Sequence, residues 1–278
     1  MRPRPFHLLR PRTLDEALEA WNAPGADAAL LAGGQSLVAD LNAGHRTVGT
    51  VIDIKGIREL DELALSGDVL RIGALTTHEQ LAGIGEGDLP PALAAVPRVA
   101  RTVAPRPIRV RGTVVGNLAA GFRGATWPAL LGAYGTTVEA RTPDGRTARG
   151  DVRDAVRFAA ERYVVTALEV PAGRKVGWAE ATVRASGRSC RVACGVRRED
   201  DGTVTAWLSG LAPVVVRHEN VPPADEALGE LARSAVAGAS APARTARPAG
   251  PEDETELWRT VVHTVLRRAR NDLEEEAA

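Results

Sequence analysis

The segment "LLAGGQSLVADL", residues 30–41, places two adjacent glycines between an apolar run and a second apolar stretch. Strand-like residues that stop at Gly33 and Gly34, followed by helical spacing from Leu37, predict a tight turn that opens onto a helix. Glycine is needed in such a turn where φ is positive or where another group approaches the main chain closely. The segment therefore indicates either an ordinary turn or a backbone cradle for an anion, and the rest of the chain must distinguish them.

Composition limits the class of protein. The chain has 278 residues, of which 44% are hydrophobic and 25% charged, so it can bury a sizeable core. Its 35 basic and 35 acidic residues cancel, which disfavours nucleic acid or an anionic membrane as partner and favours a small molecule. The start, "MRPRPFHLLRPR", lacks an apolar core, and no run approaches the ~20 apolar residues of a membrane span. These features predict a cytoplasmic protein.

Cysteine and histidine do not indicate a metal centre or a catalytic site. Cys190 and Cys194 alternate along a predicted strand, too far apart for a disulfide, and are interpreted as small core residues. Two thiols cannot hold an iron–sulfur cluster alone, because such clusters usually take four thiolates. The five histidines are scattered without ligand spacing, and no Ser/His/Asp signature is present. We therefore expect no catalytic residue and no metal.

The order of predicted elements favours an α+β fold rather than a doubly wound parallel sheet, because strands cluster late in the chain. A capping box begins a helix at residues 12–21, and alternation predicts antiparallel strands within residues 173–215. The stretch 237–253 is of low complexity and is interpreted as a loop before a C-terminal helix. Between these regions the patterns predict strands at 27–32, 50–54, 69–77 and 162–171, helices at 36–42, 77–84 and 127–135, and a hairpin at 136–150.

A second glycine-bearing turn, "RGTVVGN" at residues 111–117, stands out beside the first. Turns from two separated segments could together surround a pyrophosphate with N–H donors. Neither turn matches G-x-G-x-x-G, and no G-x-x-x-x-G-K occurs, so the Rossmann fingerprint and the P-loop are both excluded.

The motifs "LLAGGQSL", "VIDIKGIREL", "LRIGALTTHEQL", "PIRVRGTVVGNLA", "PALLGAYG", "VVTALEVP" and "RASG" occur along nearly the whole chain. In this order they resemble the FAD-binding medium subunits of molybdenum hydroxylases, such as carbon monoxide dehydrogenase and the flavin domain of xanthine dehydrogenase. The resemblance implies a PCMH-type FAD-binding domain of two α+β subdomains over residues 1–172. It also implies a smaller domain over 173–278, with a three-stranded antiparallel sheet and helices.

The resemblance also implies which residues contact FAD. In the family, an A-G-G-x-S turn and a T-x-G-G-N turn both wrap the cofactor, largely through backbone N–H groups. Transferred position by position, the first turn is Ala32, Gly33, Gly34, Gln35 and Ser36, and the second is Thr113, Val114, Gly116 and Asn117. Thr126 stands where the family usually has an Asp that contacts the nucleotide.

Departures from the family pattern gather at the expected cofactor site. Val115 replaces the first glycine of T-x-G-G-N, and a β-branched residue is poorly tolerated where φ is positive or a ligand comes close. Thr126 cannot anchor a ribose as a charged acceptor would. Glu180 lies around the family's Lys position near the flavin ring, and Arg188 replaces an Asp. Loss of the family's positive charge near the ring predicts altered redox tuning, unless Arg184, Arg188 or Lys175 replaces it.

Other conspicuous residues are given structural interpretations. Trp127 and Trp178 are expected to be core aromatics, and Tyr163 a packing residue. His78 is expected to face solvent at a helix start. Asp53, in a buried strand, is expected to accept from backbone N–H groups.

These observations favour a flavoprotein that passes electrons from iron–sulfur centres to an external acceptor, while a separate molybdopterin subunit oxidises the substrate. Two alternatives are a stand-alone FAD-dependent enzyme acting on a small molecule at the flavin, and a member that has lost FAD and serves as a binding or scaffold subunit. The clustering of the departures at the cofactor site motivates the stand-alone enzyme. Val115 and Thr126 motivate the subunit that has lost FAD.

Overall fold

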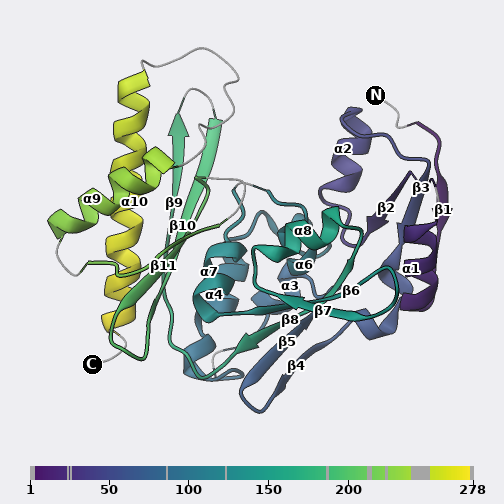
Figure 1. The fold of residues 1–278 in the computed structure, drawn as a ribbon, viewed down its shortest axis with the longest axis horizontal. Helices are drawn as coiled ribbons and strands as arrows, with labels where there is room; N and C mark the ends of the chain where they lie inside the picture. Colours follow the sequence, from purple (N-terminus) through teal and green to yellow (C-terminus); the bar gives the residue numbers. More distant parts are fainter. Residues whose placement is uncertain are drawn as a thin grey trace. The chain divides into compact units, whose positions relative to one another are not determined.

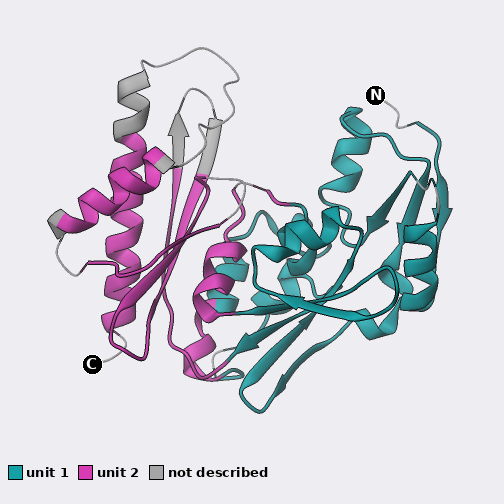
Figure 2. Ribbon diagram, in the orientation of Figure 1, with its two compact units in different colours: residues 1–89, 96–120, 136–171 teal, residues 90–95, 121–135, 172–278 magenta. Residues whose placement is uncertain are grey.

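Two sheets and the helices packed on them form the N-terminal part of the chain in the computed structural model (Figure 1). The structure describes residues 4–23, 25, 27–85, 87–122, 124–185, 188–211, 215–222, 225–238 and 251–275, and only the backbone at 183–185, 188–190, 225–226, 238 and 251–256. It divides into unit 1, residues 1–89, 96–120 and 136–171, and unit 2, residues 90–95, 121–135 and 172–278 (Figure 2).

The first sheet of unit 1 is parallel, with strand order β1-β3-β2. Its strands are β1 (His7–Leu9), β2 (Ala28–Leu31) and β3 (Thr50–Asp53). Helix α1 (Leu14–Asn22) begins at Thr13, whose side chain accepts from the Glu16 N–H, as the capping box predicts. Helix α2 (Leu37–Ala43) and strands β2 and β3 share a small apolar cluster around Leu41 and Val51.

The second sheet of unit 1 is antiparallel, with order β4-β5-β8-β6-β7. Its strands are β4 (Leu63–Ser66), β5 (Val69–Gly73), β6 (Thr137–Arg141), β7 (Thr147–Gly150) and β8 (Val164–Pro171). The predicted hairpin is β6–β7. Strand β5 ends earlier than predicted, at Gly73, because residues 74–77 lead into helix α3. The helices of this part are α3 (His78–Ala82), α4 (Ala95–Thr102), α5 (Arg106–Arg109), α6 (Val114–Ala119) and α8 (Asp154–Ala160).

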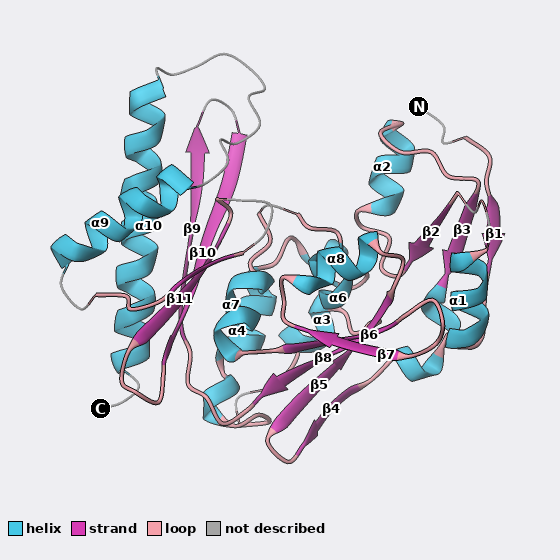
Figure 3. Cartoon of the chain, viewed as in Figure 1, coloured by secondary structure: helices cyan, strands magenta, loops and turns pink. Residues whose placement is uncertain are grey.

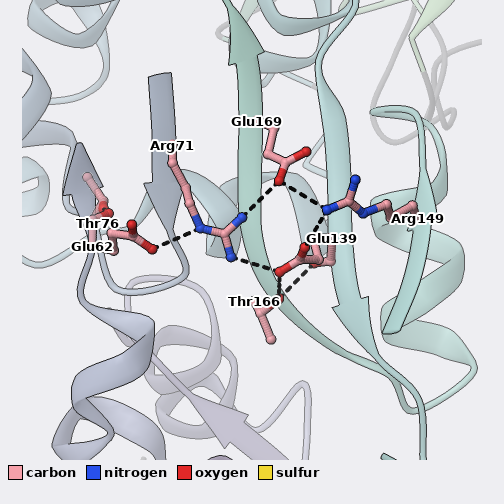
Figure 4. Close-up of polar contacts among 7 residues, drawn as sticks. All are labelled: Glu62, Arg71, Thr76, Glu139, Arg149, Thr166 and Glu169. Carbon is pink, nitrogen blue, oxygen red and sulfur yellow. Dashed lines mark hydrogen bonds and ion pairs between the residues drawn. The ribbon is translucent and has the colours of Figure 1, made fainter. Parts of the chain in front are cut away.

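A network of charged side chains crosses one face of this sheet (Figure 4). The Arg71 guanidinium donates to Glu62 at 2.8 Å, to Glu139 at 2.8 Å and to Glu169 at 3.0 Å. Arg149 on β7 adds a 3.2 Å contact to Glu139, and the arginines hold the pKa of that carboxyl below its usual range against the opposing effect of burial. The network links β5, β6, β7 and β8 and reaches Glu62, the residue before β4, across one face of the sheet.

Unit 2 contains the four-stranded antiparallel sheet β12-β11-β10-β9, whose strands β9, β10 and β11 are labelled in Figure 3. The expected sheet had three strands, which are β9 (Gly177–Ala185), β10 (Arg188–Arg198) and β11 (Val204–Ser209); β12 (Val216–His218) adds a fourth. A three-residue strand leaves too short an alternation to be recognised in sequence.

Helices α9 (Asp225–Gly238) and α10 (Pro251–Glu275) cover one face of this sheet around Val192, Val196 and Leu266. Buried, free Cys194 belongs to the same core, as expected, whereas the Cys190 side chain lies outside the described residues. Most of the predicted 237–253 loop, residues 239–250, also lies outside them.

Helix α7 (Trp127–Tyr134) packs on the opposite face, where Arg197 donates to the Ala133 carbonyl at 2.9 Å. The resulting architecture is a mixed α+β fold, as predicted. Among the described helices, none combines the length and apolar character needed to cross a membrane.

Candidate functional site

The first glycine turn, residues 32–36, connects β2 to α2 in unit 1. Gly34 has φ +78°, a left-handed conformation that L residues with side chains rarely adopt. A Cβ there would also lie 3.2 Å from Leu31 Cδ1 and 3.3 Å from Val38 Cγ2. The backbone conformation of the turn therefore requires glycine at position 34.

Gly33 is required for a different reason. A Cβ on Gly33 would lie 2.2 Å from the carbonyl oxygen of Arg111 and 2.8 Å from the α carbon of Gly112. Both neighbours are main-chain atoms of the segment that leads into the second turn, so they cannot rotate away. The two turns, about 80 residues apart in sequence, thus lie in direct backbone contact, and Gly33 makes that contact possible.

The first turn keeps its backbone donors open. The N–H groups of Gly33, Gly34, Gln35 and Ser36 donate to no carbonyl or side chain among the residues that the structure describes. The carbonyls of Gly34 and Ser36, in contrast, accept from Val38 and Asp40 at 3.0 Å each. Gln35 and Ser36 are exposed. Consecutive free N–H groups at a helix start form a site suited to an anion.

The second turn is hydrogen-bonded to residues 76–78, at the start of α3. Thr77 and Thr113 form an antiparallel bridge, the His78 N–H donates to the Gly112 carbonyl at 2.9 Å, and the Val114 N–H donates to the Thr76 carbonyl at 3.1 Å. Thr113 then caps α6, because its side chain accepts from the Gly116 N–H at 3.0 Å. The Thr76 hydroxyl also donates to the Glu62 carbonyl, in the region of the charged network (Figure 4).

Val115 does not strain this turn. It lies inside α6 and is 4% exposed, and its φ is not positive. The expectation that valine conflicts with a left-handed backbone here is therefore wrong. The β-branched run predicted no helix, but the Thr113 cap and the bridges to residues 76–78 fix α6 regardless of the low helix propensity of valine.

Asn117 offers an unused acceptor. Its side-chain Oδ1 is buried and makes no hydrogen bond among the described residues. An unpaired buried carbonyl oxygen costs about 1–3 kcal/mol, so a donor from outside the chain would stabilise it. The open N–H groups of the first turn and this acceptor fit a ligand that presents both an anionic group and a hydroxyl or N–H donor, as FAD does.

A cluster around α3 supports the second turn, and sequence reasoning did not assign it to the site. Glu79 accepts from Arg106 at 2.6 Å and from Arg109 at 2.9 Å, and these bonds lower the pKa of Glu79. Arg109 also donates to the carbonyls of Arg101 and Ala104. The alternation of arginines in "PRPIRVRG", with Glu79 in "THEQL", was the only signal in the sequence.

His78 is buried, at 3% exposure, and the expectation that it faces solvent is wrong. Burial, with a smaller effect of the Arg109 charge, lowers the pKa of His78 from 6.5 to about 4, so the ring is neutral at pH 7. Its Cδ2 would lie 3.2 Å from a Cβ on Gly112. The neutral imidazole thus fills the space beneath the second turn.

The remaining candidates belong to unit 2 or have structural roles. Thr126 precedes α7, is 3% exposed, and makes no side-chain cap hydrogen bond. Glu180 on β9 lies 3.8 Å from Arg191 of β10. As expected, Trp127 and Trp178 are buried.

Two further interpretations are also confirmed. Tyr163 stacks on Phe158 with a centroid distance of 5.4 Å. Asp53 accepts from the Lys55 N–H at 3.2 Å.

Comparisons with known proteins agree with one another. Residues 4–172 match the family described as the FAD binding domain in molybdopterin dehydrogenase. The chain is 30% identical over 229 residues to the carbon monoxide dehydrogenase medium chain of Hydrogenophaga pseudoflava, with 79% of each chain covered. It is 33% identical over 140 residues to caffeine dehydrogenase subunit beta of Pseudomonas sp. (strain CBB1), covering 50% of this chain and 46% of that one.

A solved structure of Cu,Mo-CO dehydrogenase in its cyanide-inactivated form is similar over 98% of this chain and 100% of that chain. Its TM-score is 0.80 and its sequence identity 25%.

Proposed function

This chain belongs to the family of FAD-binding subunits of molybdenum hydroxylases, and from that premise we propose that it is the electron-transfer subunit of such an oxidoreductase. When bound, FAD supplies the redox chemistry, taking electrons from iron–sulfur centres and delivering them to an external acceptor. The observation that carries the proposal is the pair of touching turns, which combines open N–H donors with the unpaired Asn117 acceptor.

The residues of unit 1 divide the binding between them. The first contact is made by the first turn, Ala32, Gly33, Gly34, Gln35 and Ser36. Its N–H groups from Gly33 onward hold the pyrophosphate. Thr113, Val114, Gly116 and Asn117 provide the second contact. Within it, Thr113 orients α6 and the Asn117 Oδ1 accepts from a hydroxyl or N–H of the cofactor. Thr126, in unit 2, is a further predicted contact.

No residue of this site needs to act as an acid or base. Relay of electrons through FAD requires that the protein bind and orient the cofactor and set its reduction potential. Because the pKa of His78 is lowered, its imidazole is neutral and packs beneath the turn. The domain division that we propose, residues 1–172 for FAD binding and 173–278 for the C-terminal domain, follows the end of the family match.

The partners in this proposal are an iron–sulfur subunit and a molybdopterin subunit. The names of the relatives support it, since they are a medium chain and a subunit beta, which are parts of larger dehydrogenases. Those dehydrogenases act on carbon monoxide and caffeine, so the flavin subunit does not identify the substrate. The stand-alone enzyme and the scaffold subunit remain the alternatives for the experiment to separate.

Purification with co-expressed neighbouring subunits tests the proposal. We expect a yellow protein with about one FAD per chain, which co-purifies with iron–sulfur and molybdopterin subunits and whose flavin is reduced when the substrate of the complex is added. A colourless protein that still assembles would support the scaffold alternative. A yellow protein that never assembles, but turns over a small molecule, would support the stand-alone enzyme.

A further inference from the structure

Strand β1 is an edge strand with apolar side chains on the surface. Phe6, Leu8 and Leu9 are 39%, 44% and 43% exposed, and they account for three of the ten large hydrophobic residues described as exposed. All three lie within four consecutive residues. Scattered exposed apolar residues are ordinary, but a group of them on an open strand edge is a site of association.

Both faces of the sheet are incomplete at this edge. Leu8 lies opposite Val51, which belongs to the apolar cluster under α2, and Leu9 lies opposite Ile52, which is fully buried. Successive side chains point to opposite faces, so each of the two apolar layers ends in an exposed leucine. Strands of parallel sheets are normally covered on both faces, but among the described residues the side chains of β1 are exposed on both.

The backbone of β1 is open on the same side. The His7 N–H donates to the Gly49 carbonyl at 2.8 Å, so His7 and Leu9 direct their hydrogen-bonding groups toward β3. Because the direction alternates along a strand, the N–H and carbonyl of Leu8 point outward, away from the sheet. Another extended segment can therefore pair with β1.

Charge argues against a second copy of this chain as the occupant in the two antiparallel registers centred on β1. An antiparallel pair centred on His7 would place Arg4 opposite Arg10, and one centred on Leu8 would place Arg4 opposite Arg12. Arg4 and Arg12 are exposed, and the Arg10 side chain is 75% exposed. Like charges directly opposite each other destabilise a strand pair, whereas carboxylates at both ends of an apolar strand would pair with these arginines.

We propose that β1 binds an extended segment of a partner subunit, apolar on both faces and flanked by Asp or Glu, which adds a fourth strand to the β1-β3-β2 sheet. The inference rests on the proposed function, since it requires that the chain assembles with other subunits. Leu8 and Leu9 are the apolar contacts, and Arg4 and Arg10 set the register.

Hydrogen exchange on the assembled complex tests the proposal directly. The probe is the complex reconstituted from this chain and its co-expressed iron–sulfur and molybdopterin subunits, compared with the isolated chain. We expect the Leu8 amide to become at least tenfold more slowly exchanging on assembly. The amide of Leu65 serves as control, because Leu65 lies on the edge strand β4 and is similarly exposed, at 41%.

Substitutions provide a second readout. Leu8→Asp is expected to weaken assembly at least tenfold, Arg10→Glu is expected to weaken it less and to reduce its dependence on salt, and Leu65→Asp is expected to leave it unchanged. A complex that forms with the Leu8 amide unprotected and with wild-type affinity for Leu8→Asp would overturn this inference and leave the proposed function intact. An isolated chain that dimerises and is dissociated by Leu8→Asp would identify a second copy as occupant, and failure to assemble at all would contradict both proposals.

Discussion

The two glycine-bearing turns of unit 1 resemble each other in sequence but are built differently. The first, residues 32–36, depends on the absence of side chains, since Gly33 contacts the Arg111 carbonyl and Gly34 has a positive φ. The second, residues 111–117, depends on hydrogen bonds with residues 76–78 and accommodates Val115 in a helix. One turn is fixed by backbone conformation and the other by its surroundings, so they should respond to different changes.

Gly33→Ala should have the largest effect. The new Cβ would meet main-chain atoms at 2.2 Å, and the turns would have to separate. Overpacking against backbone that cannot move costs about 3 kcal/mol of unfolding free energy or more, and flavin binding should be lost with it. Urea denaturation and flavin content measure both effects. Gly173→Ala is the control, because a Cβ there meets nothing within 4 Å, and equal stability of the two variants would disprove the contact between the turns.

Gly34→Val should abolish flavin binding with less damage to the fold. A side chain at φ +78° costs about 1–2 kcal/mol, and it crowds the N–H groups that we assign to the pyrophosphate. Flavin affinity should fall by at least 100-fold in fluorescence titrations. Gly67→Val, at φ +55° with nothing within 4 Å, places the same side chain at a positive φ away from the turn. Full flavin content in Gly34→Val would refute the placement of the cofactor.

Acid should loosen the second turn through His78. Its folded pKa of about 4 lies below the ordinary 6.5, so its contribution to stability is complete above pH 6.5 and is lost as the pH falls toward 4. Between these two pH values the unfolded chain binds a proton that the folded chain does not. This difference lowers the free energy of unfolding by about 3 kcal/mol at most.

Wild type and His78→Gln, each denatured with urea at pH 7 and pH 4.5, isolate this contribution from the carboxylates, which lose their own stabilisation in acid. We expect the wild type to lose more stability than the variant. Equal losses would show that folding does not lower the pKa of His78.

Substitutions of Val115 test whether the second turn tolerates a side chain at this position. On the sequence alone, Val115→Gly should keep or raise flavin occupancy by restoring the family's glycine. The structure adds a cost, because Val115 is buried in α6: loss of the side chain and of helix propensity should lower stability by about 2–3 kcal/mol. With saturating FAD, occupancy should still match the wild type. Val115→Ala separates the two costs, and a sharp loss of flavin in both variants would show that the turn requires valine.

Glu180→Gln should have the smallest effect of these substitutions. It serves as a reference for the flavin midpoint potential, because Glu180 lies outside both turns. Arg191 lies 3.8 Å from Glu180 in unit 2 and offsets its charge. We therefore expect the flavin midpoint potential to move by less than about 30 mV, which corresponds to about 1.4 kcal/mol for a two-electron couple. Spectroelectrochemistry measures the shift, and a larger one would mean that Arg191 does not neutralise Glu180.

Sequence alone determined the class of fold and most of the elements. Local patterns were sufficient for α1, with its Thr13 cap, for the β6–β7 hairpin and for β8, because capping and alternation act between residues close in the chain. The order of motifs also located both turns. The short strand β12 was missed because three residues show almost no alternation.

Only the tertiary structure decided why each residue of the turns is there. The contact of Gly33 with Arg111, the burial of His78 and the helical position of Val115 all depend on segments brought together from distant parts of the chain. A glycine required by φ and one required by a neighbouring carbonyl look identical in sequence. They differ physically because the first is required by its own backbone dihedral angle, and the second by main-chain atoms about 80 residues away in sequence.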